Sequence, residues 1–385
     1  MLFRHFDNKI LCEAEILSKK GFAVDIIGPD FDPRFNLGRL KLPSGVHARS
    51  ITLRRRTLPI IDPELVLKQL VLALRSSSRI CHCYGMNELV CALALRTLGR
   101  RVIYDMGDDV PSILGTMIGS KCGSMQIGHF IESTLRTFEV ICCRRFDRIV
   151  GLTKRLTSGM SKFNGRIVTI GYYPDPCFNP SNVDPFLVRK YKGFKVIVFD
   201  GRLIPEKGTY IMLSVADIVR RVIPNFKLLL IGGFVSHSEE KSFNRAISDL
   251  GLQNHVESVG WVTYCEVPKY INLGKLGLSL LTDWCYSYVI TEPYKVLEMM
   301  SCGLPVIATN GNIVSRELIQ ESGGGILVDQ SDIKAIADCV IRLLFDEYEA
   351  NQMGLKAREF MEKTRRWSDF EEKLLSVYAS LFPNR

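Results

Sequence analysis

The chain has 385 residues, of which 46% are apolar and 24% charged, and its formal net charge is +9 at pH 7. That length exceeds one typical hydrophobic core, so we expect a globular protein of two domains. The sequence offers no run of ~18 apolar residues that could span a membrane, and its start lacks the basic-then-apolar order of a secretory signal. The twelve cysteines match no zinc pattern, which indicates reduced thiols in a cytoplasmic protein.

The positive charge is concentrated in the first half. Residues 1–172 carry 26 Lys and Arg against 15 Asp and Glu, whereas residues 173–385 carry 24 against 26. The run Arg54, Arg55 and Arg56 belongs to this excess. A basic half beside a neutral half suggests that the two halves meet different partners. For the basic half, the candidates are an anionic membrane surface and an acidic acceptor. A solvated face without a partner remains the alternative, and we do not expect nucleic acid.

The first half alternates short apolar runs with amphipathic helical patterns. Helices are expected over 8–20, 86–98 and 129–146, and strands over the following segments: 22–29, 101–107, 147–153 and 166–172. Only "MLFRHF" precedes the first helix, so the opening strand of this half is very short or missing.

The second half repeats the alternation. Helices are expected over 209–223, 240–250 and 292–302, and strands over these segments: 194–201, 226–233, 255–261, 276–282, 305–310 and 325–329. Strands that alternate with helices predict parallel sheets covered on both faces, and the signal appears twice. We therefore predict an α/β protein of two doubly wound, Rossmann-like domains.

Proline-rich "GYYPDPCFNPSNVDPF", residues 171–186, interrupts all periodicity and predicts the domain boundary. The expected domains are 1–172 and 173–360. The charged region 347–382 predicts a long helix with one apolar face, and its last part, 361–385, is expected to pack back on the first domain.

The stretch "VFDGRLIPEKGTY", residues 198–210, predicts a binding site for a di-anion. Gly201 lets the chain turn at the carboxyl end of a strand, and Thr209 opens a helix. A helix start supplies free N–H groups and a partial positive charge, to which Arg202 and Lys207 add two full charges. A diphosphate fits this turn. An ordinary surface turn is the alternative.

A second constellation lies in "TEPYKVLEMMSCGLPVIATN", residues 291–310. Lys295 and Glu298 are three positions apart, so they share one face of a predicted helix. A carboxylate there can accept hydrogen bonds from two neighbouring hydroxyls, such as those of a ribose. The alternative is a local Lys–Glu pair that stabilises the helix by about 0.2–0.5 kcal/mol.

Together these segments resemble the retaining glycosyltransferases of family 4, which have the GT-B fold. "GRLIPEKG" looks like the family's G-R-L-x-x-x-K-G turn, and "EPYKVLEMMSCGLPVIAT" is similar to the P-x-K-x-x-E variant of its donor-binding helix. "IPNFKLLLIGG" looks like the strand that follows the turn, and "GGGILVD" resembles the strand after the donor-binding helix. "LGLQNHVESVGWVTYCEVPKYINLGKLGLSLL" is similar to the family's nucleotide-base region. The resemblance implies two Rossmann-like domains that face each other across a cleft, with a C-terminal helix crossing back to the first.

The resemblance also implies roles for single residues. Arg202 and Lys207 would bind the donor diphosphate beside Gly201 and stabilise it as it leaves, with Lys295 nearby. Glu298 would bind the ribose. The backbone around Gly260, Trp261 and Val262 would line the pocket for the base. Gly233 would allow the diphosphate to approach closely. The donor would be a nucleotide-diphosphate sugar, with UDP or GDP as the nucleotide, and no metal or cofactor is implied.

Two departures from the family pattern stand out. Family members commonly carry a carboxylate eight positions before the ribose-binding one, where this chain has Ile290; Glu292 is the candidate substitute. In the first half, Gly107 stands where a strand end often presents a histidine, and Asp108 or Asp109 would face the acceptor or cap the next helix. His82 aligns with another such histidine, and the alternative is a packed strand residue.

We therefore predict a glycosyltransferase that transfers a sugar to a glycan or lipid-linked acceptor, in the cytoplasm or at the inner face of a membrane. A nucleotide-sugar-binding protein whose activity was lost with Ile290 and Gly107 is the alternative. An epimerase of the same architecture lacks matching histidines, and no G-x-G-x-x-G after a strand supports an oxidoreductase.

Overall fold

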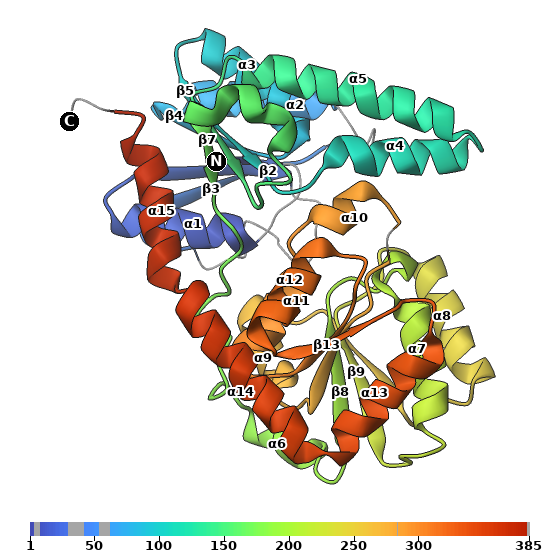
Figure 1. Cartoon of the computed structure of the whole chain (residues 1–385). Helices are drawn as coiled ribbons and strands as arrows, with labels where there is room; N and C mark the ends of the chain where they lie inside the picture. Colours follow the sequence, from blue (N-terminus) through green and yellow to red (C-terminus); the bar gives the residue numbers. More distant parts are fainter. Residues whose placement is uncertain (4–7, 30–41, 54–61, 283, 383–385) are drawn as a thin grey trace. The chain divides into compact units, whose positions relative to one another are not determined.

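A computed structural model describes residues 1–3, 8–29, 42–53, 62–282 and 284–382 (Figure 1). The Arg54–Arg56 run lies outside these described residues. The chain divides into two compact units, which are described separately. The first comprises Met1–Gly171, Cys285–Ser287 and Ser368–Arg385, and the second comprises Tyr172–Trp284 and Tyr288–Trp367.

The first unit is built on a seven-stranded sheet whose order is β3-β2-β1-β4-β5-β6-β7. Every neighbouring pair is parallel. The strands are β1 Leu2–Phe3, β2 Val24–Pro29, β3 Val46–Ile51, β4 Ile80–Tyr84, β5 Arg101–Met106, β6 Arg148–Gly151 and β7 Ile167–Thr169. The opening strand, β1, is therefore central but only two residues long. Strand β3 was not among the expected ones, whereas β4 contains His82, which the alternative reading placed in a strand.

Helices cover both faces of this sheet, as expected for parallel strands. They are α1 Asn8–Lys19, α2 Pro63–Leu74, η1 Met86–Glu88, α3 Leu89–Thr97, α4 Val110–Lys121, α5 Met125–Cys143 and η2 Ser158–Arg166. The strand side chains between them are fully buried, for example Val102, Ile103 and Ile149.

Helices α4 and α5 form an antiparallel hairpin (Figure 1). Helix α5, capped by Ser124, begins four residues before the predicted start, and α4 is the helix that the capping alternative places after Asp109, for which no range was predicted. The two backbones touch at glycines: a Cβ on Gly115 would lie 2.8 Å from the carbonyl oxygen of Gly128. These glycines therefore permit close helix packing rather than end a helix.

The last helix, α15, runs over Trp367–Ala379, and from Ser368 onward it belongs to the first unit. Its buried face includes Phe370, Leu374 and Tyr378. The Tyr378 hydroxyl lies 2.9 Å from His82 Nδ1, and Arg148 donates to the Ser380 hydroxyl at 2.8 Å. The predicted packing of the C-terminal helix on the first half is thus confirmed.

The second unit is built on a six-stranded parallel sheet of order β10-β9-β8-β11-β12-β13. Its strands are β8 Lys195–Asp200, β9 Phe226–Ile231, β10 Val256–Gly260, β11 Leu276–Ser279, β12 Val306–Thr309 and β13 Gly325–Val328. Each lies within one of the six predicted segments, so the doubly wound architecture of this half is confirmed.

Helices also cover both faces of the second sheet. They are α6 Pro185–Lys190, η3 Pro205–Lys207, α7 Thr209–Val219, α8 His237–Asp249, η4 Tyr264–Glu266, α9 Val267–Ile271, α10 Tyr286–Ile290, α11 Tyr294–Ser301, α12 Ile313–Ser322, α13 Ile333–Phe345 and α14 Glu347–Thr364. Along β8 the side chains alternate between two cores, with Ile197 and Phe199 in one and Val196 and Val198 in the other.

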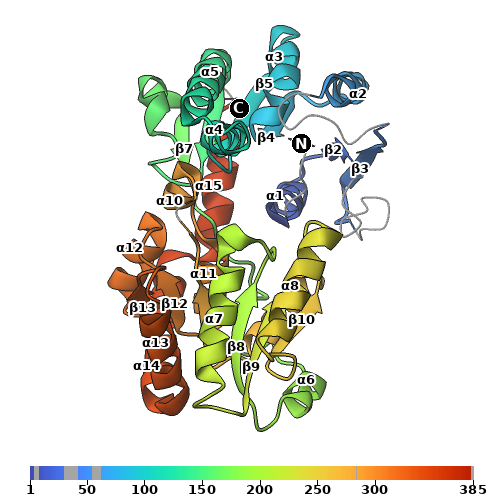
Figure 2. The ribbon, with the colours of Figure 1, turned by 90° about the vertical axis from the view of Figure 1, so that its right-hand side faces the viewer.

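Helices α7 and α13 cover the first core and α11 and α14 the second; α7 and α8 lie side by side in Figure 2. The predicted long helix over 347–382 is two helices, because the chain leaves helical geometry at Arg365 (φ −130°, ψ 43°) between α14 and α15. Within the described residues, no helix is long and apolar enough to cross a membrane.

Candidate functional site

The predicted di-anion site lies where β8 turns into α7, at the carboxyl edge of the second sheet. Gly201 adopts φ +117° and Gly208 φ +76°, both in the region that favours glycine. A Cβ on Gly208 would overlap the carbonyl group of Leu280, so glycine is required for α7 to begin against the end of β11. Open sheets of this kind bind ligands at this edge.

Two ammonium groups lie beside Gly201. A Cβ on Gly201 would be 3.4 Å from Lys295 Nζ and 3.9 Å from Lys207 Nζ. Lys207 ends the 3₁₀ turn before α7 and is half-buried, whereas Arg202 follows Gly201 directly and is exposed. The structure therefore brings together Lys207 and Lys295, which are 88 positions apart in the sequence, and places Arg202 next to them in the chain.

The amino group of Lys295, a half-buried residue on the first turn of α11, is itself buried. Among the described residues its Nζ has no hydrogen-bond partner, and it lies 3.9 Å from the centroid of the Phe199 ring. Burial, followed by the charge of Lys207, lowers the pKa of Lys295 well below its ordinary value, although Asp200 and Glu298 oppose this. A buried ammonium group in this position favours an anionic ligand.

Asp200 and Glu298 are the carboxyl groups next to Lys295. Burial raises the pKa of Asp200, while Lys295 acts in the opposite direction. The pKa of Glu298 is raised well above its ordinary range, first by burial and then by Asp200. Two carboxyl groups in contact share a proton more readily than they bear two charges. Glu298 is 5% exposed.

Two tyrosines that sequence reasoning missed bind Glu298. The hydroxyl groups of Tyr172 and Tyr264 both donate to Glu298 Oε1, the second at 2.9 Å, and they contact each other. They are 92 positions apart, and although Tyr264 lies in the segment that resembles the nucleotide-base region, neither tyrosine was assigned a role. No local sequence signal could have found them.

The predicted base pocket lies at the neighbouring strand ends. Trp261 is 42% exposed, and its indole covers Gly233, where a Cβ would overlap Nε1. Gly233 is thus needed for the close packing of Trp261. Val262 is half-buried against the core. The Gly232 N–H donates to the Gly260 carbonyl at 2.9 Å, which joins the ends of β9 and β10.

Glu292, the proposed substitute for the missing carboxylate at Ile290, is 3% exposed and engaged within the protein. Its Oε1 accepts from Arg365 at 2.5 Å, and its Oε2 accepts from the backbone N–H of Tyr172. The guanidinium group of Arg365 also lies 5.6 Å from the Tyr173 ring centroid. Glu292 therefore joins the two segments at which the chain enters and leaves the second unit. We call this set the Glu292 clamp.

In the first unit, the two predicted aspartates differ in environment. Asp109 is buried, caps α4 by accepting from the Ser112 N–H at 3.2 Å, and pairs with Arg136 at 2.9 Å. Asp108 is exposed at the carboxyl end of β5. The helix-capping alternative thus describes Asp109, and Asp108 remains the candidate for contact with an acceptor.

His82 is a packed strand residue. It is 2% exposed, stacks on Tyr84 with ring centroids 4.4 Å apart, and lies 3.6 Å from Asp105. Lys9 pairs with the same aspartate at 2.6 Å. Burial would raise the pKa of Asp105, but Lys9 and His82 hold it below its ordinary value. The ammonium group of Lys9 already serves as the cation of this buried cluster, whose remaining carboxylate is Glu13.

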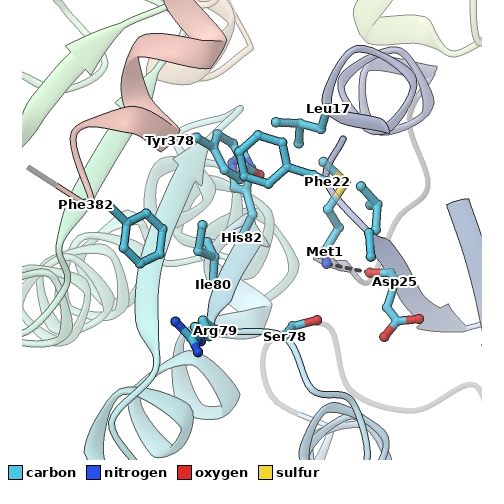
Figure 3. Close-up of a pocket in the computed structure, with 12 residues that line it drawn as sticks. Met1, Leu17, Phe22, Asp25, Ser78, Arg79, Ile80, His82, Tyr378 and Phe382 are labelled. Atoms are coloured by element: carbon cyan, nitrogen blue, oxygen red, sulfur yellow. Dashed lines mark hydrogen bonds between the residues drawn. The ribbon is translucent and has the colours of Figure 1, made fainter. Parts of the chain in front are cut away.

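A cavity of about 350 Å³ opens near the amino ends of β2 and β4 (Figure 3). Leu17, Phe22 and Tyr378 gather on one side of it and Arg79 on another (Figure 3). Gly107 and Asp108 follow the carboxyl end of β5 and do not line the cavity, whereas His82 does. The cavity is therefore separate from Gly107 and Asp108 but borders His82.

Comparison with known proteins gives one family match: the model for glycosyl transferases group 1 matches residues 182–360. A GDP-mannose-dependent alpha-(1-6)-phosphatidylinositol monomannoside mannosyltransferase of Mycobacterium tuberculosis is 28% identical over 179 residues, 46% of each chain. The chain thus matches about half the length of the first such relatives. N-acetyl-alpha-D-glucosaminyl L-malate synthase of Bacillus anthracis is 24% identical over 95% of this chain and 90% of its own.

Two solved structures are similar over nearly the whole chain. Sucrose-phosphate synthase from Thermosynechococcus elongatus has a TM-score of 0.75 at 19% identity and covers 100% of this chain and 96% of its own. Anabaena Alr3699/HepE in complex with UDP and glucose has a TM-score of 0.73 at 16% identity, with 98% and 99% covered. At these identities the likeness establishes the fold.

Proposed function

We propose that the chain is a retaining glycosyltransferase, on the premise that residues 182–360 match the model for glycosyl transferases group 1. It transfers a sugar from a nucleotide-diphosphate sugar to a glycan or lipid-linked acceptor. The solved neighbours confirm the fold predicted from the sequence, GT-B. The related mannosyltransferase uses GDP-mannose, and the Anabaena neighbour contains UDP, so both nucleotides remain candidate donors.

The observation that carries the proposal is the pair of ammonium groups at Gly201. The amino group of Lys295 is buried without a hydrogen-bond partner among the described residues, and Lys207 lies beside the same glycine at the start of α7. Burying a cation is costly unless an anion compensates for its lost hydration. A diphosphate supplies that charge and also accepts hydrogen bonds from the N-terminal N–H groups of α7.

In the proposed reaction the cations act on the leaving group. The bond between the sugar C1 and the diphosphate oxygen breaks, and negative charge develops on the diphosphate. Arg202, Lys207 and Lys295 stabilise that charge, which is the type of interaction that accelerates transfer. The acceptor hydroxyl attacks C1 from the same face and passes its proton to the departing phosphate oxygen, so the configuration is retained.

We assign the remaining donor contacts to residues on α11 and directly after β10. Glu298 binds the ribose hydroxyls, and the exposed face of Trp261 packs against the base beside Val262. Glu292 is held in its clamp by Arg365 and Tyr172, so we assign it to positioning the loop before α11 rather than to the transferred sugar.

The basic first half supports an anionic acceptor surface, and Asp108 is our candidate for contact with the acceptor hydroxyl. The related mannosyltransferase acts on a phosphatidylinositol mannoside. We propose that this chain also works at a membrane surface that carries anionic lipid. Co-sedimentation with anionic vesicles at low salt, against neutral vesicles, tests this; equal binding to both would contradict it.

A nucleotide-sugar-binding protein without turnover is the second candidate. It is favoured by one observation: Ile290, at the position where the family carries a carboxylate, is 1% exposed and fully apolar. Persistent donor binding without transfer to any acceptor would support this candidate.

A thermal-shift screen with UDP-, GDP- and ADP-sugars tests the proposed function. We expect one nucleotide series to stabilise the wild-type chain and to lose that effect in Lys207→Ala. Arg220→Ala is the control, because Arg220 lies at the other end of α7 and pairs with Asp217 at 2.7 Å. Stabilisation by none of the three series would contradict the proposal.

A further inference from the structure

We infer that the hydroxyl group of Tyr264 occupies the place on Glu298 that a ribose must take, and that Tyr172 positions this carboxyl group. The inference rests on the proposed function, because it assigns Glu298 to the ribose of the donor. It adds two residues that set the selectivity of the site for ribose.

The two tyrosines present Glu298 with the same groups as a ribose. Their hydroxyl oxygens contact each other, and both donate to Oε1 of the same carboxyl group. A ribose likewise offers two adjacent hydroxyls to one carboxylate. In the ligand-free chain, Tyr172 and Tyr264 therefore satisfy the hydrogen-bonding capacity that the ribose would use.

Counting the hydrogen-bonding positions of Glu298 shows that the ribose must displace a partner. A carboxyl group offers about four such positions on its two oxygens. The two tyrosine hydroxyls take both positions on Oε1. A ribose that gives one hydroxyl to each oxygen of the carboxylate needs one of these two positions. One tyrosine hydroxyl must therefore leave when the ribose binds in this way.

Tyr264 is the partner that can leave. It lies in the short turn η4, is half-buried, and its ring meets Phe178 at an angle of 56°. Tyr172, by contrast, is 7% exposed, and its ring stacks on Tyr294 at 11° with centroids 4.0 Å apart. Its backbone N–H also donates to Glu292. Tyr172 is thus fixed on both sides.

This arrangement makes the Tyr264 hydroxyl an internal competitor of the ribose. A nucleotide with ribose hydroxyls binds only by breaking the bond between Tyr264 and Glu298, whereas a dideoxynucleotide binds without breaking it. Removal of the hydroxyl should therefore strengthen binding of the ribonucleotide alone. Loss of the Tyr172 hydroxyl should have the opposite effect, because the carboxyl group is then no longer held in position.

Calorimetry on the full chain tests the inference with UDP, GDP and their 2′,3′-dideoxy forms. We expect Tyr264→Phe to bind the ribonucleotide about 3- to 10-fold more tightly, the range of one net hydrogen bond, and the dideoxy form unchanged. Tyr172→Phe should lose ribonucleotide affinity relative to the dideoxy form. Tyr191→Phe is the matched control, because its hydroxyl donates to Glu257 at the same distance of 2.9 Å.

An unchanged ratio of the two affinities in Tyr264→Phe would overturn the inference and leave the proposed function intact. Failure of the wild-type chain to bind either nucleotide would overturn both. If Tyr264→Phe does not fold, NMR of the wild-type chain labelled at tyrosine Cζ tests the displacement instead. The chemical shift of the Tyr264 signal should change when the ribonucleotide is added and should not change when the dideoxy form is added. A signal that moves with neither would refute the displacement.

Discussion

The ammonium group of Lys295, on α11, lies 3.9 Å from the centre of the Phe199 ring, on β8. The amino group has no hydrogen-bond partner among the described residues, and burial lowers its pKa. An anion bound beside it would favour its charged form.

Lys295→Met should separate phosphate binding from nucleoside binding. Methionine fills a similar volume over Phe199 but carries no charge, so nucleoside diphosphate affinity should fall about tenfold or more. Affinity for the nucleoside without phosphates should not change. Isothermal titration calorimetry measures both, with the exposed Lys334→Met as control. Equal losses for the two ligands would show that Lys295 supports the fold rather than the phosphates.

Arg202→Ala and Lys207→Ala should each reduce the rate of sugar transfer by about 10² or more, because each removes a positive charge that stabilises the developing diphosphate anion. Steady-state kinetics with saturating acceptor measures the effect. A matched loss in Arg220→Ala, at the far end of α7, would indicate a general disturbance of that helix instead. Normal rates in both variants would contradict the diphosphate assignment.

Ribose binding should depend on pH through Glu298. Burial and Asp200 raise the pKa of this carboxyl group, so in the ligand-free chain it stays protonated to a higher pH than an ordinary glutamate. Accepting two ribose hydroxyls requires the carboxylate form. Nucleotide affinity should therefore increase as pH rises through the raised pKa, and binding should release a proton. Calorimetry in buffers of different ionisation enthalpy detects the proton, and Glu298→Gln should abolish it.

Glu139 should make the first unit less stable at neutral pH than at acidic pH. Burial raises its pKa to about 7 from an ordinary value of 4.5, and the Tyr104 hydroxyl donates to it at 2.5 Å. Between these two values the folded chain retains a proton that the unfolded chain releases, so stability falls as pH rises from 4.5 to 7. The loss is on the order of 3 kcal/mol.

Glu139→Gln keeps an acceptor for Tyr104 and cannot ionise, so its stability should change less between pH 5 and pH 8 than that of the wild type. Urea unfolding followed by a probe in the first unit measures the difference. Glu15→Gln, on the surface of α1, is the control. The same pH dependence in wild type and Glu139→Gln would exclude a buried carboxylate as the cause.

The fold elements that sequence reasoning predicted correctly are local in the chain. Gly201, Arg202 and Lys207 share one turn, whose geometry depends on glycine and on the start of a helix. Such requirements are local, and a single sequence displays them. The six strands of the second half are also local, because each is a short apolar run between turn residues.

The missed features depend on contacts between distant segments. Helix α4 contains Gly115 and Gly119, which reduce helix propensity but allow the backbone of α5 to approach. When the sequence of α4 is considered without α5, these glycines indicate a break in the helix. The same applies to Tyr172 and Tyr264, whose hydroxyl groups matter only because Glu298 lies between them. Tyr172 also lies in the proline-rich segment that predicted only a boundary.

The Glu292 clamp has a consequence for how this protein can be divided. It binds Tyr172, where the chain enters the second unit, and Arg365, where it leaves, so the two cut ends of that unit are neighbours in space. A segment whose ends meet can be transplanted between loops without stretching either junction. Apart from Cys285–Ser287, which belong to the first unit, the span 172–367 is therefore suited to grafting as a single cassette, by which the proposed donor preference could be exchanged between two such chains.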